Sequence, residues 1–377
     1  MRILVHEFVS GGGLAGQGVA ASLAREGAAM RNALVADLAA IPQHRIVATA
    51  DPRFPLPALP RVEVVTLPPG SAARLDDLIA SADAVWLVAP ETGGCLERLA
   101  AKAEGKGRML LGSGAAAIRR ASDKAGLARR LARHGVPHPK TRVLRPGTDF
   151  RIAARGVGYP VVVKPARGAG CSGVCLARDA RELRHAVDIA RSADGKGPLL
   201  LQRYVPGVAA SVSLLADGRC AVALTVNAQS MRVARPFAYR GGMTPLDHPL
   251  AGRAVEAAVR TCRSLPGLRG YVGVDLVLTD SEAVVIEVNP RLTTAYLGVR
   301  SALEGNVAAL ALAACAGALA APPPVRRRVR FTAAGRIVAI DPPTLSLPHT
   351  RGEGKCCPPN GSGEGCARIH SPGLRHR

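Results

Sequence analysis

The sequence has few aromatic residues, no CxxC motif and no hydrophobic run long enough for a membrane span. Aromatic residues make up only 3% of the 377 residues, so a surface that binds nucleic acid by base stacking would have few side chains to use. The nine cysteines include no CxxC pair, which argues against a zinc ribbon or a thioredoxin-like motif. We therefore interpret the cysteines as reduced thiols in a cytoplasmic protein.

The longest apolar stretch is Val307–Ala321, which is rich in alanine and is followed by three prolines. It is shorter than the roughly 20 residues that a helix needs to cross a bilayer. We expect a buried helix there and no contact with a membrane. The N-terminus does not read as a signal peptide, because the short apolar run Ile3–Val5 is followed at once by His6 and Glu7.

Positive charge is in large excess. The chain has 50 Lys and Arg against 28 Asp and Glu, a formal net charge of +22. Most of this charge is arginine scattered among Ala and Gly, without a long basic run, which is typical of solvated helix faces. A patch for an anionic substrate or a nucleotide is the alternative. We expect no nucleic-acid partner.

Hydrophobic patterning divides the chain into four parts. Residues 1–120 alternate strand-like and helix-like patterns, which predicts an α/β domain with a parallel, Rossmann-like sheet. The expected strands are Arg2–Val5, Arg45–Ala50, Val62–Leu67, Ala84–Ala89 and Met109–Leu111, and the expected helices include Gly18–Ala40 and Ser71–Ser81. We expect this domain to bind substrate.

The remaining parts differ from the first. Residues 121–200 form an expected small α+β subdomain, and residues 201–341 an expected second one that is dominated by hairpins. Their predicted elements are the helix Asp123–His134, the strand Pro160–Lys164, the helix Ala180–Ser192 and a helix near Pro249–Arg263. Residues 342–377 lack hydrophobic periodicity, which is typical of a disordered tail.

The first glycine cluster, Gly11–Gly16, matches G-x-G-x-x-G after an expected strand and before an expected helix. A dinucleotide site of this kind also needs an acidic residue about 20 positions later. Asp37 has that spacing but lies inside a helical pattern, and Asp51 ends a strand but lies too far along. A lone match is weak, so we favour a tight turn or an anion-binding loop. Candidate substrate residues at this strand end are His6, Glu7, Ser10, Gly11, Gly12 and Gly13; a solvated strand end is the alternative for the first two.

A second glycine cluster follows a strand that ends in a lysine. Gly168, Gly170 and Gly173 come shortly after Lys164. Glycines let a backbone approach phosphates closely, and a neighbouring lysine supplies positive charge. This loop is not a Walker A motif, because no GK[ST] follows, and an ordinary hairpin turn is the alternative. We interpret Cys171 as a small loop residue because no partnering histidine is indicated.

The strongest chemical pattern is the hairpin formed by Tyr271–Leu278 and Ala283–Arg291. Alternation places Asp275, Glu287 and Asn289 on one face. The opposite face should carry apolar residues, namely Val274, Leu276, Leu278, Val284, Ile286 and Val288. If the turn has an odd number of residues, Asp275 lies directly opposite Glu287. Two carboxylates and an amide so close together suit Mg²⁺ or Mn²⁺, because like charges repel unless a cation joins them. A solvated outer face is the alternative.

Five motifs in order resemble the ATP-grasp ligases. They are Ser122-Asp123-Lys124, Gly135–Thr141, the Val161–Val174 loop, Gln202–Gly207, and the pair Gly273-Val274-Asp275 with Glu287–Arg291. The match covers about residues 120–315. The opening Met1–Gly13 is similar to a subgroup that includes the tyramine–L-glutamate ligases of methanofuran biosynthesis and their relatives. The tail resembles nothing in that subgroup.

The resemblance implies a role for each matching residue. Lys124 and Lys164 would contact ATP phosphates, and the loop Gly168, Gly170, Cys171, Ser172 and Gly173 would fold over them. The segment Gln202, Arg203, Tyr204 and Val205 would hold adenine. Asp275, Glu287 and Asn289 would bind one or two Mg²⁺ ions, and Arg291, with Lys164, would serve catalysis. Such ligases often have an acid just past the adenine segment, but this chain has Val208-Ala209-Ala210, so the ribose contact has no candidate.

The implied activity is ATP-dependent joining of a carboxylate to an amine through an acyl phosphate, with release of ADP and phosphate. The implied fold is ATP-grasp, an α/β fold in which two α+β subdomains hold ATP. The subgroup implies glutamate and tyramine or a related amine as substrates. Another acid–amine pair stays open, as does an oxidoreductase that would rest on Gly11–Gly16 alone. The oligomeric state also stays open, with a homodimer as one alternative.

Deletion of residues 342–377 should leave melting temperature and activity almost unchanged, because nothing in that segment has the periodicity needed to pack. Thermal melting and activity of the full-length and shortened chains check this. A large drop in either quantity would mean that the tail contributes to the fold or to the site.

Overall fold

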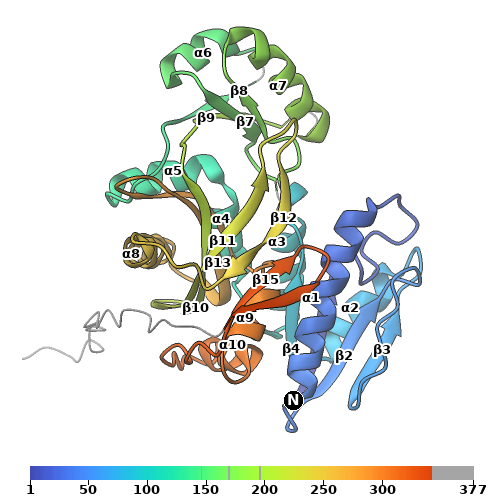
Figure 1. The fold of residues 1–377 in the computed structure, drawn as a ribbon. Helices are drawn as coiled ribbons and strands as arrows, with labels where there is room; N and C mark the ends of the chain where they lie inside the picture. The colour runs from blue at the N-terminus through green and yellow to red at the C-terminus, as the bar shows by residue number, and fades with distance from the viewer. Residues whose placement is uncertain (146, 169, 195–196, 342–377) are drawn as a thin grey trace, which may run out of the picture.

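Three β-sheets follow one another along the chain (Figure 1). The computed structural model describes residues 1–145, 147–168, 170–194 and 197–341. The tail that we predict to be disordered lies outside the described residues. The sheets confirm the predicted mixed α/β fold, with one parallel sheet followed by antiparallel ones.

The N-terminal sheet has five parallel strands in the order β3-β2-β1-β4-β5. They are β1 (Arg2–Glu7), β2 (Arg45–Ala50), β3 (Val62–Thr66), β4 (Ala84–Val88) and β5 (Met109–Leu110), so all five predicted strands are confirmed. The sheet is covered on both faces. Helix α1 (Ala21–Ala39) packs with Ile3 and Val5 on one face. Helices α2 (Ala72–Ser81) and α3 (Cys95–Gly105) pack with Leu4 on the other face, and the short 3-10 helix η1 (Thr92–Gly94) precedes α3.

A small antiparallel sheet forms the lobe at the top of Figure 1. Its strand order is β6-β9-β7-β8, made of β6 (Thr141–Leu144), β7 (Val161–Pro165), β8 (Cys175–Ala177) and β9 (Leu199–Arg203). Helices α6 (Phe150–Val157) and α7 (Ala180–Asp194) pack against it. The expected strand at Pro160–Lys164 and the expected helix at Ala180–Ser192 are thereby confirmed within one or two residues.

The large sheet has seven strands in the order β14-β13-β10-β11-β12-β15-β16. They are β10 (Val208–Asp217), β11 (Ala221–Arg232), β12 (Ala238–Thr244), β13 (Arg269–Leu278), β14 (Ala283–Asn289), β15 (Arg328–Thr332) and β16 (Ile337–Asp341). Helices α4 (Ala115–Ser122), α5 (Lys124–Arg133) and α8 (Ala251–Arg263) pack on one face. Helix α5 therefore packs on the large sheet, although the sequence groups it with the small one.

The core on the other side of the large sheet is shared with the N-terminal domain. Helices α9 (Tyr296–Ala302) and α10 (Val307–Cys315) contribute to the same cluster as α1, β1 and Tyr271. Helix α10 is the buried apolar helix that the sequence predicts. Within the described ranges, we find no helix that combines the length and apolar character of a bilayer span.

The β13–β14 hairpin corrects the predicted turn. Its turn contains residues 279–282, an even number, yet Asp275 still lies opposite Glu287. The register shifts by one residue between the Asp275–Glu287 pair and the Leu276–Val285 pair, so Ile286 is an extra residue in a β-bulge. The bulge also changes which side chains face the core. Val285 packs there beside Leu276, whereas we expected Val284 and Ile286 in that position.

Asp37 joins α1 to α9 and α10. Its carboxylate accepts hydrogen bonds from the Tyr296 hydroxyl at 2.5 Å and from Arg300 Nε at 2.7 Å. Its backbone oxygen accepts from Asn306 Nδ2 at 2.7 Å. This carboxylate is therefore occupied by a contact between domains and does not lie at a strand end, which removes the acidic partner from the oxidoreductase interpretation of Gly11–Gly16.

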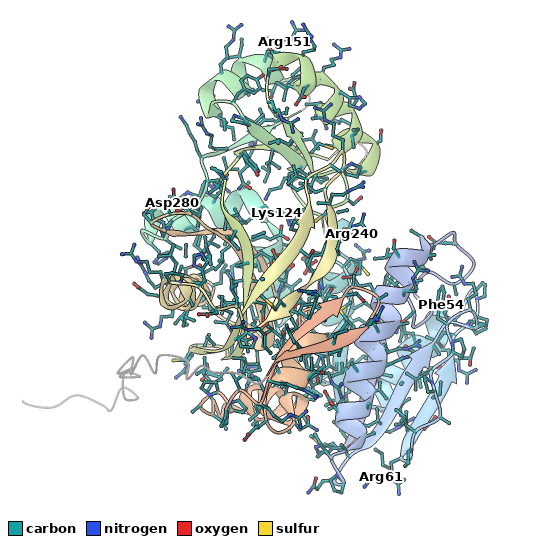
Figure 2. All side chains as sticks on the ribbon, in the orientation of Figure 1. Phe54, Arg61, Lys124, Arg151, Arg240 and Asp280 are labelled. Atoms are coloured by element: carbon teal, nitrogen blue, oxygen red, sulfur yellow. The ribbon has the colours of Figure 1, made fainter. Side chains whose placement is uncertain are left out.

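Asp37→Asn should lower the free energy of unfolding by roughly 1–3 kcal/mol, because the substitution leaves the largely buried Arg300 without its carboxylate. Chemical denaturation of the variant and the wild type checks this. Asp280→Asn is the matched control, because Asp280 lies exposed in the β13–β14 turn (Figure 2). Equal stability of the two variants would contradict the importance of the Asp37 contact.

Candidate functional site

The site is built around two carboxylates on adjacent strands. Asp275 of β13 and Glu287 of β14 are directly paired in the ladder. Two amides hold Asp275: Gln229 Nε2 donates to Oδ1 at 2.8 Å, and Asn289 Nδ2 donates to Oδ2 at 3.0 Å. The structure therefore brings together all three predicted metal ligands, and it adds Gln229 from β11.

The two carboxylates have very different pKa values, because burial, their mutual repulsion and the nearby lysines affect them unequally. Burial, reinforced by the charge of Glu287, raises the pKa of Asp275 from 3.8 to about 7. Burial alone would also raise the pKa of Glu287, but Lys124 and Lys164 more than offset it and lower that pKa. Glu287 is thus the charged member of the pair, and Asp275 is the member that is partly protonated near neutral pH.

Two lysines face Glu287. Lys124 begins α5, directly after the N-cap Asp123, whose side chain accepts a hydrogen bond from the Gly126 N–H. Its Nζ lies 3.0 Å from Glu287 Oε2 and donates to the Gly168 carbonyl at 2.9 Å. Figure 2 shows Lys124 near the level where the large sheet meets the upper lobe. This one ammonium therefore connects the acidic pair to the glycine-rich loop.

Lys164 lies on β7 and is only 3% exposed. Burial lowers its pKa from 10.5 to about 8, and the negative charge of Glu287 limits the shift. At pH 7 the ammonium form still predominates. Lys164 therefore presents a positive charge that has lost most of its hydration, and such a charge gains strongly from a phosphate.

The glycine-rich loop connects β7 to β8. Gly170 and Gly173 have φ of 67° and 69°, and Cys171 has φ of 63°, so three loop residues adopt the left-handed region. A Cβ on Gly173 would lie 2.7 Å from the Ala193 Cβ, which also requires glycine there. Gly168 and Ser172 complete the predicted set. Burial raises the pKa of the Cys171 thiol to about 12, which favours the unreactive thiol form, as we expected.

The predicted adenine-holding segment lies where β9 ends. Gln202 is buried, and its Nε2 donates to the Thr141 hydroxyl at 3.0 Å. The Arg203 N–H donates to the Lys140 carbonyl and the Tyr204 N–H to the Pro160 carbonyl. The chain then passes through Val205 into β10, so this segment connects the small sheet to the large one. Its role toward adenine stays a prediction.

Arg291, two residues beyond Asn289, reaches the N-terminal domain. Its Nε donates to Glu91 Oε1 at 2.9 Å and its Nη2 to Glu91 Oε2 at 3.0 Å. Glu91 follows β4, at the carboxyl edge of the parallel sheet. All three sheets thus contribute to one site: Glu91 comes from the first, Lys164 from the second, and Asp275 with Glu287 from the third.

Four of the six N-terminal candidates are buried, and Gly12 and Gly13 are partly exposed. His6 and Ser10 are fully buried, Glu7 is 2% exposed, and His6 Nδ1 lies 2.8 Å from the Thr49 hydroxyl. The Glu7 carboxylate accepts hydrogen bonds from the Val9 and Ser10 N–H groups and from the Ser10 hydroxyl. In this structure Glu7 holds the turn that contains Gly11, Gly12 and Gly13, so the solvated strand end is excluded. A substrate role for these residues stays a prediction.

Sequence reasoning missed Glu91 and Gln229. Glu91 could have been found by the rule that pointed to His6 and Glu7, because it too follows a buried parallel strand. Gln229 carries no local signal, since only the pairing of β11 and β13 with β10 brings it to Asp275.

The acidic pair fits a divalent cation. Asn289 uses an amide N–H to donate to Asp275 Oδ2, so its amide oxygen can serve as a ligand. Two carboxylates and one amide oxygen form a hard donor set of the kind that Mg²⁺ and Mn²⁺ prefer. Within the described part of the chain, no group of three or more His, Cys, Asp or Glu side chains could hold a metal ion, so the predicted site relies on Asn289 for its third ligand.

Two family models match the chain. Residues 121–295 match the ATP-grasp domain, and residues 44–118 match the pre ATP-grasp 3 domain. The first range contains every predicted phosphate, adenine and metal residue. The second contains Glu91.

Individual proteins give the same result. D-Alanine–D-alanine ligase of Gloeobacter violaceus is 30% identical over 258 residues, which cover 65% of this chain and 84% of that protein. Tyramine–L-glutamate ligase of Methanocaldococcus fervens is 36% identical over 102 residues, 27% of this chain and 33% of that protein. The crystal structure of an ATP-grasp superfamily protein from Archaeoglobus fulgidus has a TM-score of 0.64 and 28% identity, with 88% of this chain and 92% of that chain covered. Of several other curated relatives the chain spans only 21% to 37%.

Asp275→Asn should stabilise the ligand-free protein above neutral pH. Because folding raises the pKa of Asp275 from 3.8 to about 7, the free energy of unfolding of the wild type falls as pH rises through that interval. Above pH 7 the folded protein bears the full cost of holding this carboxylate in its charged form. Asparagine carries no charge and can donate to Glu287. The variant should melt roughly 2–6 °C higher than the wild type at pH 8, and the difference should shrink toward pH 5.

Melting curves at several pH values measure this difference, with Asp280→Asn as the exposed control. A constant difference at every pH, or a less stable variant at pH 8, would contradict the charge repulsion assigned to Asp275.

Proposed function

The chain belongs to the ATP-grasp family, and we propose that it is an ATP-dependent carboxylate–amine ligase. The observation that carries this proposal is the arrangement of Lys124, which joins the Asp275–Glu287 pair to the glycine-rich loop through Glu287 and the Gly168 carbonyl. Lys164 lies buried beside this arrangement. Such a site can hold a polyphosphate between a backbone loop and fixed positive charges.

The chemistry explains why these groups suffice. A carboxylate is a poor acyl electrophile, so its oxygen first attacks the γ-phosphorus of ATP and ADP leaves. The amine then attacks the acyl phosphate and forms an amide, and phosphate leaves with the former carboxylate oxygen. Phosphoryl transfer depends mainly on positioning and charge neutralisation, so no nucleophilic side chain is required.

Each group of residues has a proposed role. Lys124 and Lys164 bind the phosphates, the loop from Gly168 to Gly173 covers them, and the segment from Gln202 to Val205 holds adenine. Arg291 steadies the transferred phosphoryl group, which carries negative charge throughout the reaction. Asp275, Glu287 and Asn289 would hold Mg²⁺ or Mn²⁺, which when bound neutralises phosphate charge.

The substrates are the finer part of the proposal. The similarity to tyramine–L-glutamate ligases and the opening Met1–Gly13 support glutamate and tyramine, or a related amine, as in methanofuran biosynthesis. The longer match to D-alanine–D-alanine ligase supports a different acid–amine pair as the second candidate. Both pairs are small molecules, and the reaction needs neither a nucleic acid nor a membrane. We place it in the cytoplasm.

An assay of ADP release tests the substrates. We expect turnover with glutamate and tyramine in a panel that also pairs glutamate with other amines and D-alanine with itself. Turnover only with another pair would replace the substrates and leave the ligase proposal standing. No ADP release with any acid–amine pair would contradict the ligase proposal.

Isotope transfer tests the mechanism. ¹⁸O placed in the γ-carboxylate of glutamate should appear in the released phosphate, because that oxygen attacks phosphorus and leaves with it. Mass spectrometry of the phosphate measures the transfer, and chromatography should show ADP. Formation of AMP and pyrophosphate, or label found only in the amide, would overturn the acyl-phosphate mechanism.

A further inference from the structure

Glu91 and Arg291 form a largely buried, bidentate ion pair in the site. Two parallel N–H···O bonds join the side chains, at 2.9 and 3.0 Å, across 200 positions of sequence. The Glu91 side chain is 4% exposed and that of Arg291 is 14% exposed. A paired geometry of this kind fixes the plane of the guanidinium group as well as its position.

Local structure holds Glu91 in place. It follows β4 and precedes η1 and α3, where the Gly94 N–H donates to the Glu91 carbonyl and the Leu96 N–H donates to the Pro90 carbonyl. Gly93 and Gly94 both adopt positive φ, so the chain turns sharply there. The carboxylate is thus presented by a tight turn at the edge of the parallel sheet.

Arg291 makes one further hydrogen bond and keeps enough N–H groups to bind an anion. Its Nη1 donates to the Leu292 carbonyl at 3.1 Å. Together with the two bonds to Glu91, this contact uses three of the five N–H groups that a guanidinium offers. The other two can meet an anionic oxygen without breaking the pair.

We propose that Glu91 is a positioning residue, which fixes Arg291 for the transferred phosphoryl group and thereby links the N-terminal domain to phosphoryl transfer. This inference rests on the proposed ligase function, because Arg291 has a phosphoryl group to meet only in that reaction. Glu91 itself acts through Arg291. A small displacement of a catalytic group can cost about 10²-fold in rate.

The test uses Glu91→Gln, which keeps the shape of the side chain and removes its charge. Binding is followed by the rise in melting temperature with Mg²⁺ and ADP, first alone and then with aluminium fluoride, which mimics a phosphoryl group in transfer. We expect the variant to keep the rise caused by ADP and to lose most of the further rise caused by aluminium fluoride. Its kcat should fall about 10- to 100-fold, with the KM for ATP nearly unchanged.

Two further variants separate positioning from stability. Asp37→Asn breaks a second, partly buried ion pair between the N-terminal domain and the C-terminal part, and it should lower stability but keep the aluminium fluoride increment. Glu91→Asp keeps the charge and should retain part of the increment; it also replaces Glu91→Gln if that variant does not fold. In an Arg291→Lys background, Glu91→Gln should add little further loss of kcat.

The outcomes are distinguishable. The positioning role is wrong if Glu91→Gln keeps the full aluminium fluoride increment of the wild type. It is also wrong if Asp37→Asn loses as much of the increment as Glu91→Gln does. Either result would leave the ligase proposal intact. If the wild type shows neither an increment with aluminium fluoride nor ADP release with any substrate pair, the proposed function fails instead.

Discussion

The Glu287 carboxylate is the charge on which the rest of the site depends. It lies 3.0 Å from Lys124 and directly opposite Asp275, and its charge limits the fall in the pKa of Lys164. If it were removed, Lys124 and Lys164 would lose the carboxylate whose negative charge favours both ammonium groups most strongly. The site therefore stores electrostatic strain in the ligand-free protein, as binding sites for highly charged ligands commonly do.

Much of the fold could be predicted because buried parallel strands have a simple pattern. The apolar runs that became β1, β2 and β4 are buried on both faces, which makes them continuous in sequence, whereas the edge strands β3 and β5 are largely exposed. The metal face of β13 and β14 could also be predicted from alternation, but the turn and the bulge could not. A bulge of one residue at Ile286 changes which valines reach the core, and no residue type in the hairpin marks its position.

Contacts between distant parts of the chain mark the limit of prediction from local pattern. Gln229 reaches Asp275 through pairing of three strands, and Glu91 reaches Arg291 from another domain. The resemblance to ligases led to Lys124, Lys164 and Arg291, whereas it gave no reason to look at Glu91. The contacts that His6 and Glu7 make in holding the turn could not be predicted from the sequence either, and the role of these residues toward a substrate stays a prediction.

We propose that the Asp275–Glu287 pair holds the cation that accompanies the nucleotide. Calorimetric titration with ADP, in Mg²⁺ and then in EDTA, tests it most directly in the wild type and in Glu287→Gln. Mg²⁺ should tighten ADP binding to the wild type and have little effect on a folded Glu287→Gln variant. An equal effect of Mg²⁺ on both proteins would contradict the assignment of the metal to this pair.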